Sequence, residues 1–239
     1  MSGTFGVGRR VVVLGGRSDI ARSIVEQMRR IDPAVSVVNC VRGAGAGEVE
    51  YDGAHPEAAE RAVNEGAQRL GGVDCIIVAA GVLDTEGEDL SEPERVGRNA
   101  TVNMAGACAA GAAGANILAA HGGGTLVYLS SMAAVRPRGE MPVYSSAKQG
   151  ADSFYRCAGR NWAEDGIVTL VIRPGFVRTK MTAGLKARGG VVEPATIGAV
   201  VVAAMRRGGV GVHVVYSSPL LRAVAFIMRI VPQRIWARF

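Results

Sequence analysis

Short runs of β-branched and other apolar residues alternate along this chain with longer segments of helical pattern. The runs lie at residues 11–14, 35–40, 73–80, 125–131, 168–173 and 212–216, and the helical segments at 18–30, 56–70, 91–121, 142–164 and 194–207. Strands that are apolar throughout are buried on both faces, as in a parallel sheet covered by helices. The sequence therefore predicts an α/β fold in which residues 1–239 form a single domain around a doubly wound, Rossmann-type parallel sheet.

The composition agrees with a buried core built from small and branched side chains. The 239 residues are 49% hydrophobic but only 5% aromatic, and they include 33 glycines. This excludes a disordered chain and a disulfide scaffold. The four cysteines, Cys40, Cys75, Cys108 and Cys157, form no CxxC or Cys/His cluster, so we expect buried free thiols and no metal site.

A glycine turn follows the first predicted strand. The residues 15–21 read GGRSDIA and lead into a helix that begins near Ile20. Such a turn lets the backbone approach a pyrophosphate at a helix N-terminus. Turns of this kind are also common without a ligand, so the motif alone leaves both interpretations open.

A tyrosine and a lysine at helical spacing give a sharper indication of chemistry. Tyr144 and Lys148 are four residues apart, so they share one helix face. The ammonium group is expected to lower the pKa of the tyrosine, which would make Tyr144 a usable proton donor or acceptor. Ser131 ends the strand 125–131, and ligands bind at that carboxyl edge of a parallel sheet.

At these positions the sequence resembles the short-chain dehydrogenase/reductase family. The family pattern is a glycine turn, an Asn-Ala-Gly-like strand end, a strand-end serine, a Tyr-x-x-x-Lys pair and a Pro-Gly turn, and this chain matches it in order. The resemblance implies catalysis by Ser131, Tyr144 and Lys148, with Asn103 holding a proton-relay water. The implied cofactor contacts are Gly15, Arg17, Ser18, Asp19, Ile20, Arg42, Asp52, Ala80, Gly81, Tyr144, Lys148, Pro174 and Gly175.

The cofactor loop departs from the family pattern. Of the three family glycines only Gly15 remains, and the other two positions are Asp19 and Ala21. A carboxylate beside a pyrophosphate is unfavourable, so we expect Asp19 to face away from it. The changes affect the loop geometry rather than the chemistry.

The choice between NAD and NADP is left open by the second strand. It ends in Asn39-Cys40-Val41-Arg42 without a carboxylate for the ribose, and Arg17 and Arg42 are available for a 2′-phosphate. The resemblance favours NAD(H), and NADP(H) is not excluded. Asp52 has two equal interpretations, an adenine contact or a residue near a helix N-cap.

More narrowly, the chain resembles the branch of the family that reduces decaprenylphosphoryl-2-keto-β-D-erythro-pentose to decaprenylphosphoryl arabinose for cell-wall arabinan. LGGRSDIA, RPGFVRTKM and the C-terminal LLRAVAFIMRIVPQRIWARF carry this resemblance. It implies a polyprenyl-phosphoryl sugar as substrate and the flavoprotein oxidase of the epimerase pair as partner. The alternatives are a generic reductase of 3-oxoacyl or steroid-like ketones and a non-catalytic NAD(P)-sensing protein.

The tail at 219–239 is basic and apolar. All of the excess positive charge lies after Glu193, where the chain has no acidic residue and six arginines, Arg206, Arg207, Arg222, Arg229, Arg234 and Arg238. A helix over the tail would place Arg222 and Arg229 on one face and Leu221, Val224, Ile227, Met228 and Val231 opposite. Such a helix either lies on an anionic lipid surface or packs on the core or a second copy, and the missing acids favour lipid.

No export or membrane-spanning segment is expected. The N-terminal apolar run is too short for a signal peptide, and the uncharged stretch between Arg98 and Arg136 is interrupted by polar residues and glycines. We therefore expect a cytoplasmic or peripheral inner-membrane protein that binds no nucleic acid and can form a homo-oligomer.

Overall fold

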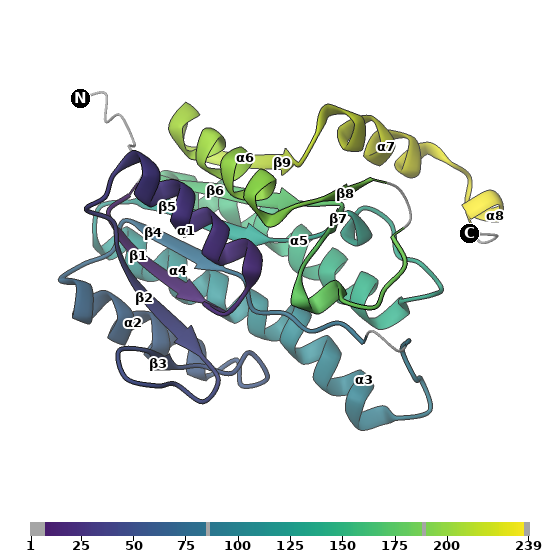
Figure 1. The fold of residues 1–239 in the computed structure, drawn as a ribbon, viewed down its shortest axis with the longest axis horizontal. Helices are drawn as coiled ribbons and strands as arrows, with labels where there is room; N and C mark the ends of the chain where they lie inside the picture. The colour runs from purple at the N-terminus through teal and green to yellow at the C-terminus, as the bar shows by residue number, and fades with distance from the viewer. Residues whose placement is uncertain (1–7, 85–86, 188–189, 237–239) are drawn as a thin grey trace.

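The sheet of the computed structural model is parallel throughout, as expected. The structure describes residues 8–84, 87–187 and 190–236. In spatial order the seven strands are β3 (Val49–Glu50), β2 (Ser36–Val41), β1 (Arg10–Leu14), β4 (Cys75–Val78), β5 (Gly124–Leu129), β6 (Ile167–Arg173) and β9 (Gly211–Tyr216), shown in Figure 1. The six predicted strands are all present, and the two-residue β3 was not predicted.

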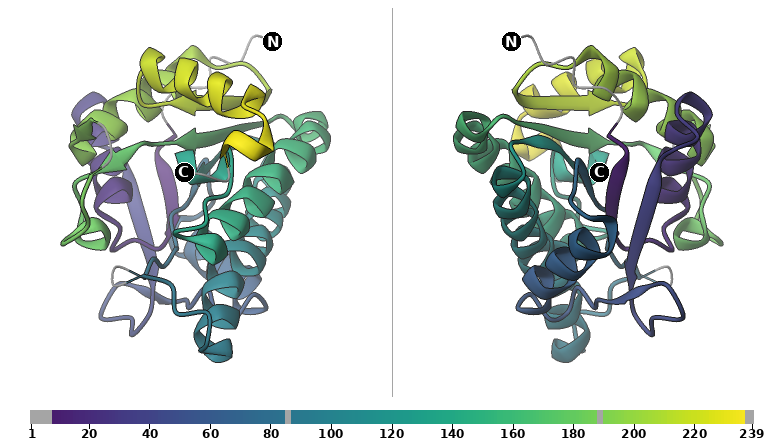
Figure 2. Two further views of the ribbon diagram at one scale, coloured as in Figure 1. Left: turned by 90° about the vertical axis from the view of Figure 1, so that its right-hand side faces the viewer. Right: turned by 90° about the vertical axis from the view of Figure 1, so that its left-hand side faces the viewer.

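Helices cover both faces of this sheet. Helices α1 (Asp19–Ile31) and α6 (Pro194–Arg207) pack on one face, and α2 (Ala58–Leu70), α4 (Ala107–Ala120) and α5 (Pro142–Trp162) pack on the other (Figure 2). Within β1, Val12 and Leu14 join one core while Val11 and Val13 join the second. This alternation is the reason why the strands are apolar without a polar face.

The helical run 91–121 is one continuous rod in three parts. Helix α3 (Pro93–Ala100) passes through a π-helical segment, Thr101–Gly106, into α4. By length and composition the stretch Pro93–Ala120 could cross a membrane, but half of its most apolar window is buried against the rest of the fold. The π-helical segment carries Asn103, and such irregularities are frequent at functional sites.

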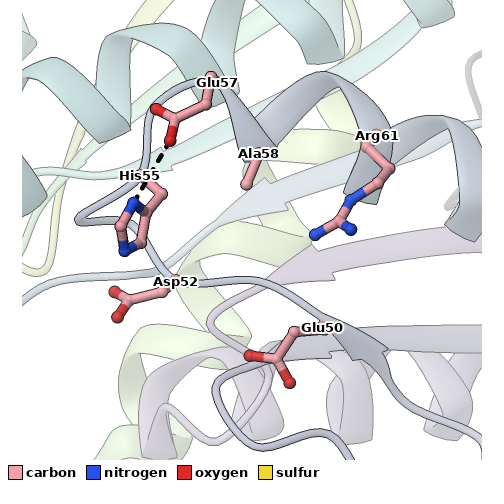
Figure 3. A pocket seen from close by; sticks show the side chains of 6 residues that line it. All are labelled: Glu50, Asp52, His55, Glu57, Ala58 and Arg61. Carbon is pink, nitrogen blue, oxygen red and sulfur yellow. Dashed lines mark ion pairs between the residues drawn. The ribbon is translucent and has the colours of Figure 1, made fainter.

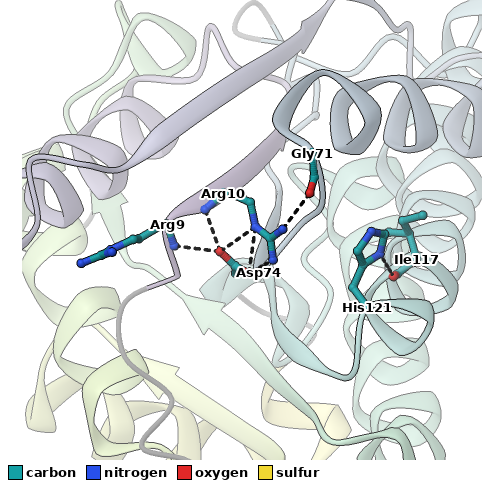
Figure 4. Close-up of polar contacts among 6 residues, drawn as sticks. All are labelled: Arg9, Arg10, Gly71, Asp74, Ile117 and His121. Carbon is teal, nitrogen blue, oxygen red and sulfur yellow. Dashed lines mark hydrogen bonds and ion pairs between the residues drawn. The ribbon is translucent and has the colours of Figure 1, made fainter.

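One carboxylate joins the amino-terminal ends of two central strands, opposite the expected site. Asp74, just before β4, accepts hydrogen bonds from the backbone amides of Arg9 (3.1 Å) and Arg10 (2.9 Å) and from the Arg10 guanidinium (Figure 4). The contacts with Arg10 hold the pKa of Asp74 below its usual range even though burial acts to raise it. Asp74 therefore aligns β1 with β4.

The C-terminal segment forms two helices, α7 (Pro219–Ile230) and α8 (Gln233–Trp236), and a separate two-stranded sheet consists of β7 (Phe176–Val177) and β8 (Val191–Val192). Ser218 caps α7, because its hydroxyl accepts the amide of Leu221 at 3.2 Å. The predicted apolar face of this helix is wrong in part. Leu221 and Met228 turn inward, whereas Val224 and Ile227 are exposed on the outer side.

Candidate active site

The predicted catalytic residues meet at the carboxyl edge of the sheet. Ser131 follows β5 and its hydroxyl accepts the amide of Ala133 at 3.1 Å, which fixes the turn after the strand. Tyr144 and Lys148 lie in the first two turns of α5, both on its buried side. The Ser131 side chain lies near enough to the tyrosine hydroxyl to act on its pKa, and Lys148 Nζ donates to the Leu129 carbonyl at 3.0 Å.

Burial controls the proton affinities at this site. It raises the pKa of Tyr144, and the neighbouring Ser131 side chain offsets only part of the rise. The predicted lowering of the tyrosine pKa by Lys148 is therefore not found, because the lysine is turned to a backbone carbonyl. Burial lowers the pKa of Lys148 to about 8, while the charge of Asp152 acts to raise it.

Asn103 is placed beside these residues by the π-helical segment. It is fully buried, and its amide nitrogen donates to the carbonyls of Val82 (2.8 Å) and Asn99 (3.1 Å). A Cβ atom added to Gly81 would lie 3.2 Å from Asn103 Oδ1 and 3.5 Å from Lys148 Nζ. Gly81 thus keeps space open between the asparagine and the lysine.

The glycine turn has the geometry that a phosphate cradle requires. Gly15 has a φ of +90° and a Cβ there would lie 2.5 Å from the Ala80 nitrogen, so only glycine fits. Ser18 caps α1 through the amide of Ala21, and the partly buried Ile20 packs against the core. The unpaired amides at the start of α1 suit the pyrophosphate of a dinucleotide.

Asp19 is directed at a distant segment rather than at its own helix. Its Oδ2 accepts the backbone amide of Lys180 at 2.8 Å, and its Oδ1 lies 3.9 Å from Lys180 Nζ. Lys180 follows the Pro174-Gly175 turn by a few residues. The Asp19 carboxylate therefore joins the glycine turn to the chain beyond β6.

Arg17 is held by a carboxylate that the sequence did not suggest. Its guanidinium donates to Glu48 Oε2 at 2.9 Å and to the carbonyls of Arg42 and Gly43, over the end of β2. Glu48 also accepts the Gly45 amide at 3.0 Å, and Glu50 accepts the Gly43 amide at 3.1 Å. The expectation that no carboxylate is available at the end of β2 is therefore wrong, because the loop after β2 folds back and places Glu48 there. Arg42 is exposed.

Asp52 follows β3, the neighbour of β2 in the sheet, and lies in an open pocket with Glu50, His55, Glu57, Ala58 and Arg61 (Figure 3). Its Oδ1 accepts the Ala54 amide at 2.9 Å, which closes a turn ahead of α2. The N-cap position of α2 belongs to Glu57 instead. The side chains of Ser131, Tyr144 and Lys148 do not line this pocket.

The Pro174-Gly175 turn is fixed beside Ser131. The Met132 amide donates to the Pro174 carbonyl at 3.0 Å, which joins the turn after β6 to the turn after β5. A Cβ on Gly175 would lie 2.8 Å from a Leu221 methyl group, so α7 closes on this turn.

A buried acid-base pair below the site was missed from the sequence. The Arg173 guanidinium donates to both oxygens of Asp152, at 2.8 and 2.5 Å, and Ser130 donates to the same carboxylate at 2.6 Å. Asp152 is one helical turn beyond Lys148, and Ser130 and Arg173 directly precede Ser131 and Pro174. The pair therefore joins all three segments of the site. The only hint of this pair in the sequence is that Asp152 stands four residues after Lys148 and that Arg173 stands directly before Pro174-Gly175.

Glu88 is a second missed residue. Its two oxygens accept the amides of Val143 (2.6 Å) and Tyr144 (2.7 Å), so it satisfies free amides at the N-terminus of α5. Glu88 comes from the loop before α3, more than fifty residues from Tyr144, at a separation that sequence patterns do not reveal.

Within the residues that the structure describes, neither the cysteines nor the other side chains that could bind a metal form a further site. Cys40 and Cys75 are buried and their pKa is raised to about 12 by burial, but Cys157 is exposed, contrary to the expectation of four buried thiols. Within residues 8–84, 87–187 and 190–236, no three His, Cys, Asp or Glu side chains gather as metal ligands would.

Comparison with known proteins identifies relatives over most of the chain. A family model described as short chain dehydrogenase matches residues 5–189. The chain is 30% identical to an uncharacterized oxidoreductase of Streptomyces coelicolor, over 96% of this chain and 95% of that protein. It is 27% identical to the 3-oxoacyl-[acyl-carrier-protein] reductase MabA of Mycobacterium avium, over 76% of this chain and 72% of that protein.

Solved structures show the same fold. The 3-oxoacyl-[acyl-carrier protein] reductase of Brucella melitensis in complex with NAD superposes with a TM-score of 0.77 at 23% identity, covering 90% of this chain and 98% of that one. A short chain dehydrogenase of Burkholderia cenocepacia in complex with NADP gives a TM-score of 0.79 at 21% identity, covering 98% of both chains.

Proposed function

The chain belongs to the short-chain dehydrogenase family of oxidoreductases, and from that premise we propose that it reduces a ketone with a nicotinamide cofactor and with Tyr144 as proton donor. The placement of Tyr144 beside Ser131, one helical turn from Lys148 on the buried side of α5, is the observation that carries this proposal. In this proposal, residues 1–239 act as one catalytic domain.

The residues at the carboxyl edge fit a dinucleotide. The glycine-only backbone at Gly15, the free amides of α1 and the gap at Gly81 leave room for a flat, phosphate-bearing group. Gly15, Ser18, Ile20, Ala80 and Gly81 would line it. When bound, the cofactor supplies the hydride that reduces the carbonyl carbon.

The side chains supply the proton and stabilise charge. Negative charge develops on the carbonyl oxygen during reduction, and the Ser131 hydroxyl is placed to donate to it. Burial keeps the Tyr144 phenol protonated, which suits an acid in the reductive direction. Lys148 and Asn103 would hold the cofactor ribose and a relay water, through which Tyr144 regains its proton.

Two substrate classes have support, and the leading one is a lipid-linked 2-keto pentose. The sequence resemblance of the tail to reductases of decaprenylphosphoryl-2-keto-β-D-erythro-pentose favours it, and a flavoprotein oxidase would then supply the ketone. A 3-oxoacyl thioester is the second candidate, favoured by the 27% identity to MabA of Mycobacterium avium. A substrate with a long isoprenoid chain stays in a bilayer, so the first class implies work at a membrane surface.

The reaction is tested with purified protein, NADH or NADPH, and each ketone in turn. Appearance of the arabinose-configured product from the polyprenyl-phosphoryl keto sugar would support the leading class, and turnover of the 3-oxoacyl thioester alone would replace it. Tyr144→Phe should lose at least about 100-fold in turnover while it binds cofactor as before. Undiminished reduction by this variant would refute the role of Tyr144.

A further inference from the structure

Large apolar side chains are exposed on the C-terminal segment far more densely than elsewhere. Among the described residues, six of the twelve exposed large hydrophobic side chains lie between positions 220 and 235: Leu220, Val224, Phe226, Ile227, Ile230 and Ile235. Leu220 is 72% exposed, and Phe226 and Ile230 are each 63% exposed. We call these six side chains the outer apolar surface.

This surface is not the side by which the helix attaches to the protein. Ala225, Met228 and Leu221 of α7 pack inward against Met132 and Val135. The helix is therefore apolar on two sides, and a helix that is apolar on nearly all sides is normally enclosed. The outer side needs an apolar neighbour that the fold does not provide.

Positive charge flanks the outer apolar surface. Arg222, Arg229 and Arg234 are exposed, and none of the ion pairs among residues 8–84, 87–187 and 190–236 involves them. No acidic residue follows Glu193. Arg222 and Arg229 are seven residues apart, so both lie on the same edge of α7, between its inner and outer sides. An apolar arc with arginines at its edge is typical of a helix that lies in the headgroup region of a membrane.

The outer apolar surface is adjacent to the carboxyl edge of the sheet, where Ser131, Tyr144 and Lys148 meet. The Arg136 guanidinium donates to the carbonyls of Met228 and Val231 at the end of α7, and Trp236 Nε1 donates to the Pro137 carbonyl at 2.9 Å. Arg136 and Pro137 lie on the loop that directly follows Ser131. Figure 1 shows α7 and α8 beyond the carboxyl ends of β6 and β9, at the edge where the site residues gather.

We propose that α7 and α8 dock on an anionic lipid bilayer through the outer apolar surface, with the active-site entrance at the bilayer. The proposal deepens the proposed function and rests on it for the nature of the substrate. A helix of 12 residues is about 18 Å long, too short to cross the hydrocarbon core, so α7 lies in the plane of the interface.

Charge favours lipid over a second copy of the chain. In a two-fold symmetric contact the same patch meets itself, so Arg222, Arg229 and Arg234 of both copies would be brought together, and the segment after Glu193 supplies no acid to pair with them. An anionic headgroup instead pairs with each arginine while the acyl chains receive the apolar side chains.

Co-sedimentation with vesicles tests the docking directly. The full chain is mixed at low salt with phosphatidylcholine vesicles that contain or lack phosphatidylglycerol. We expect binding to the anionic vesicles, at least tenfold weaker after Phe226→Asn with Ile230→Asn, and on the order of tenfold weaker after Arg222→Gln with Arg229→Gln. Added salt should weaken the wild-type binding, since exposed charges are screened.

The controls separate docking from folding, oligomerisation and catalysis. Ile31→Asn and Leu90→Asn remove exposed apolar side chains elsewhere and should leave vesicle binding unchanged. Phe226 and Ile230 do not pack in the core, so their variants should keep the wild-type Tm. Reduction of a water-soluble ketone reports the proposed chemistry independently of the vesicles. No binding to anionic vesicles at low salt would overturn the docking, as would variants that change only the oligomeric state, which would assign the surface to a second copy.

Discussion

Replacing Asp152 by asparagine tests whether the buried pair with Arg173 supports the site. The Arg173 side chain is 2% exposed and the Asp152 side chain 1%, and they share two hydrogen bonds. An asparagine keeps the shape but leaves the guanidinium buried without a counter-charge. Breaking a buried ion pair from one side typically costs about 3 to 5 kcal/mol.

That magnitude converts into a measurable change in Tm. A chain of this length loses about 2 to 4 °C per kcal/mol, so Asp152→Asn should lower the Tm by roughly 6 to 20 °C in calorimetry at neutral pH. Arg156→Gln is the matched control, because Arg156 donates to the same carboxylate from an exposed position and should change stability by only about 0 to 1 kcal/mol. Equal small shifts for both variants would refute the reasoning.

The pH dependence gives a second check on the same variant. Burial acts to raise the pKa of Asp152, but the hydrogen bonds and charge of Arg173 hold it below its usual range. A lowered carboxyl pKa contributes stability above the unfolded value of about 3.9 and loses it as the pH falls through the folded value. The difference in Tm between wild type and Asp152→Asn should therefore be largest near neutral pH and shrink below about pH 4.

Three further predictions concern the cofactor and the proton donor. Glu48→Gln should strengthen equilibrium binding of NADPH relative to NADH by about tenfold, because the substitution frees Arg17 and removes a carboxylate beside the ribose position. Glu60→Gln is the exposed control. An unchanged ratio of the two dissociation constants would refute this prediction. Glu88→Gln should slow ketone reduction and lower the free energy of unfolding by about 1 kcal/mol, because α5 loses the charged side chain that caps its N-terminus. Glu92→Gln is the control. Unchanged kinetics and Tm would contradict the idea that Glu88 positions Tyr144. The pH profile of reduction should show an ionisation near pH 8 that belongs to Lys148. In Asp152→Asn this ionisation should move to lower pH, since the Asp152 carboxylate raises the lysine pKa. An unshifted profile would show that Asp152 does not act on the pKa of Lys148.

Local sequence determined the fold and most of the candidate active site. The apolar runs predicted all six long strands because both faces of a parallel sheet are buried and leave no polar alternation. The spacing of Tyr144 and Lys148 predicted their common helix face, since that geometry depends only on the helix repeat. Ser131 joined them because strand ends of a parallel sheet share one edge.

Only the tertiary structure decided what surrounds those residues. Glu48 reaches Arg17 across a folded-back loop, Glu88 caps α5 from the loop before α3, and Arg173 on β6 pairs with Asp152 on α5. The same holds for the tail, where the helical repeat gave the faces of α7 but not which of them packs: contacts with Met132 and Val135 turned Leu221 and Met228 inward and left Phe226 and Ile230 outside. Contacts between residues far apart in sequence depend on how the elements pack, and a periodic pattern carries no information about a partner that lies outside its own period.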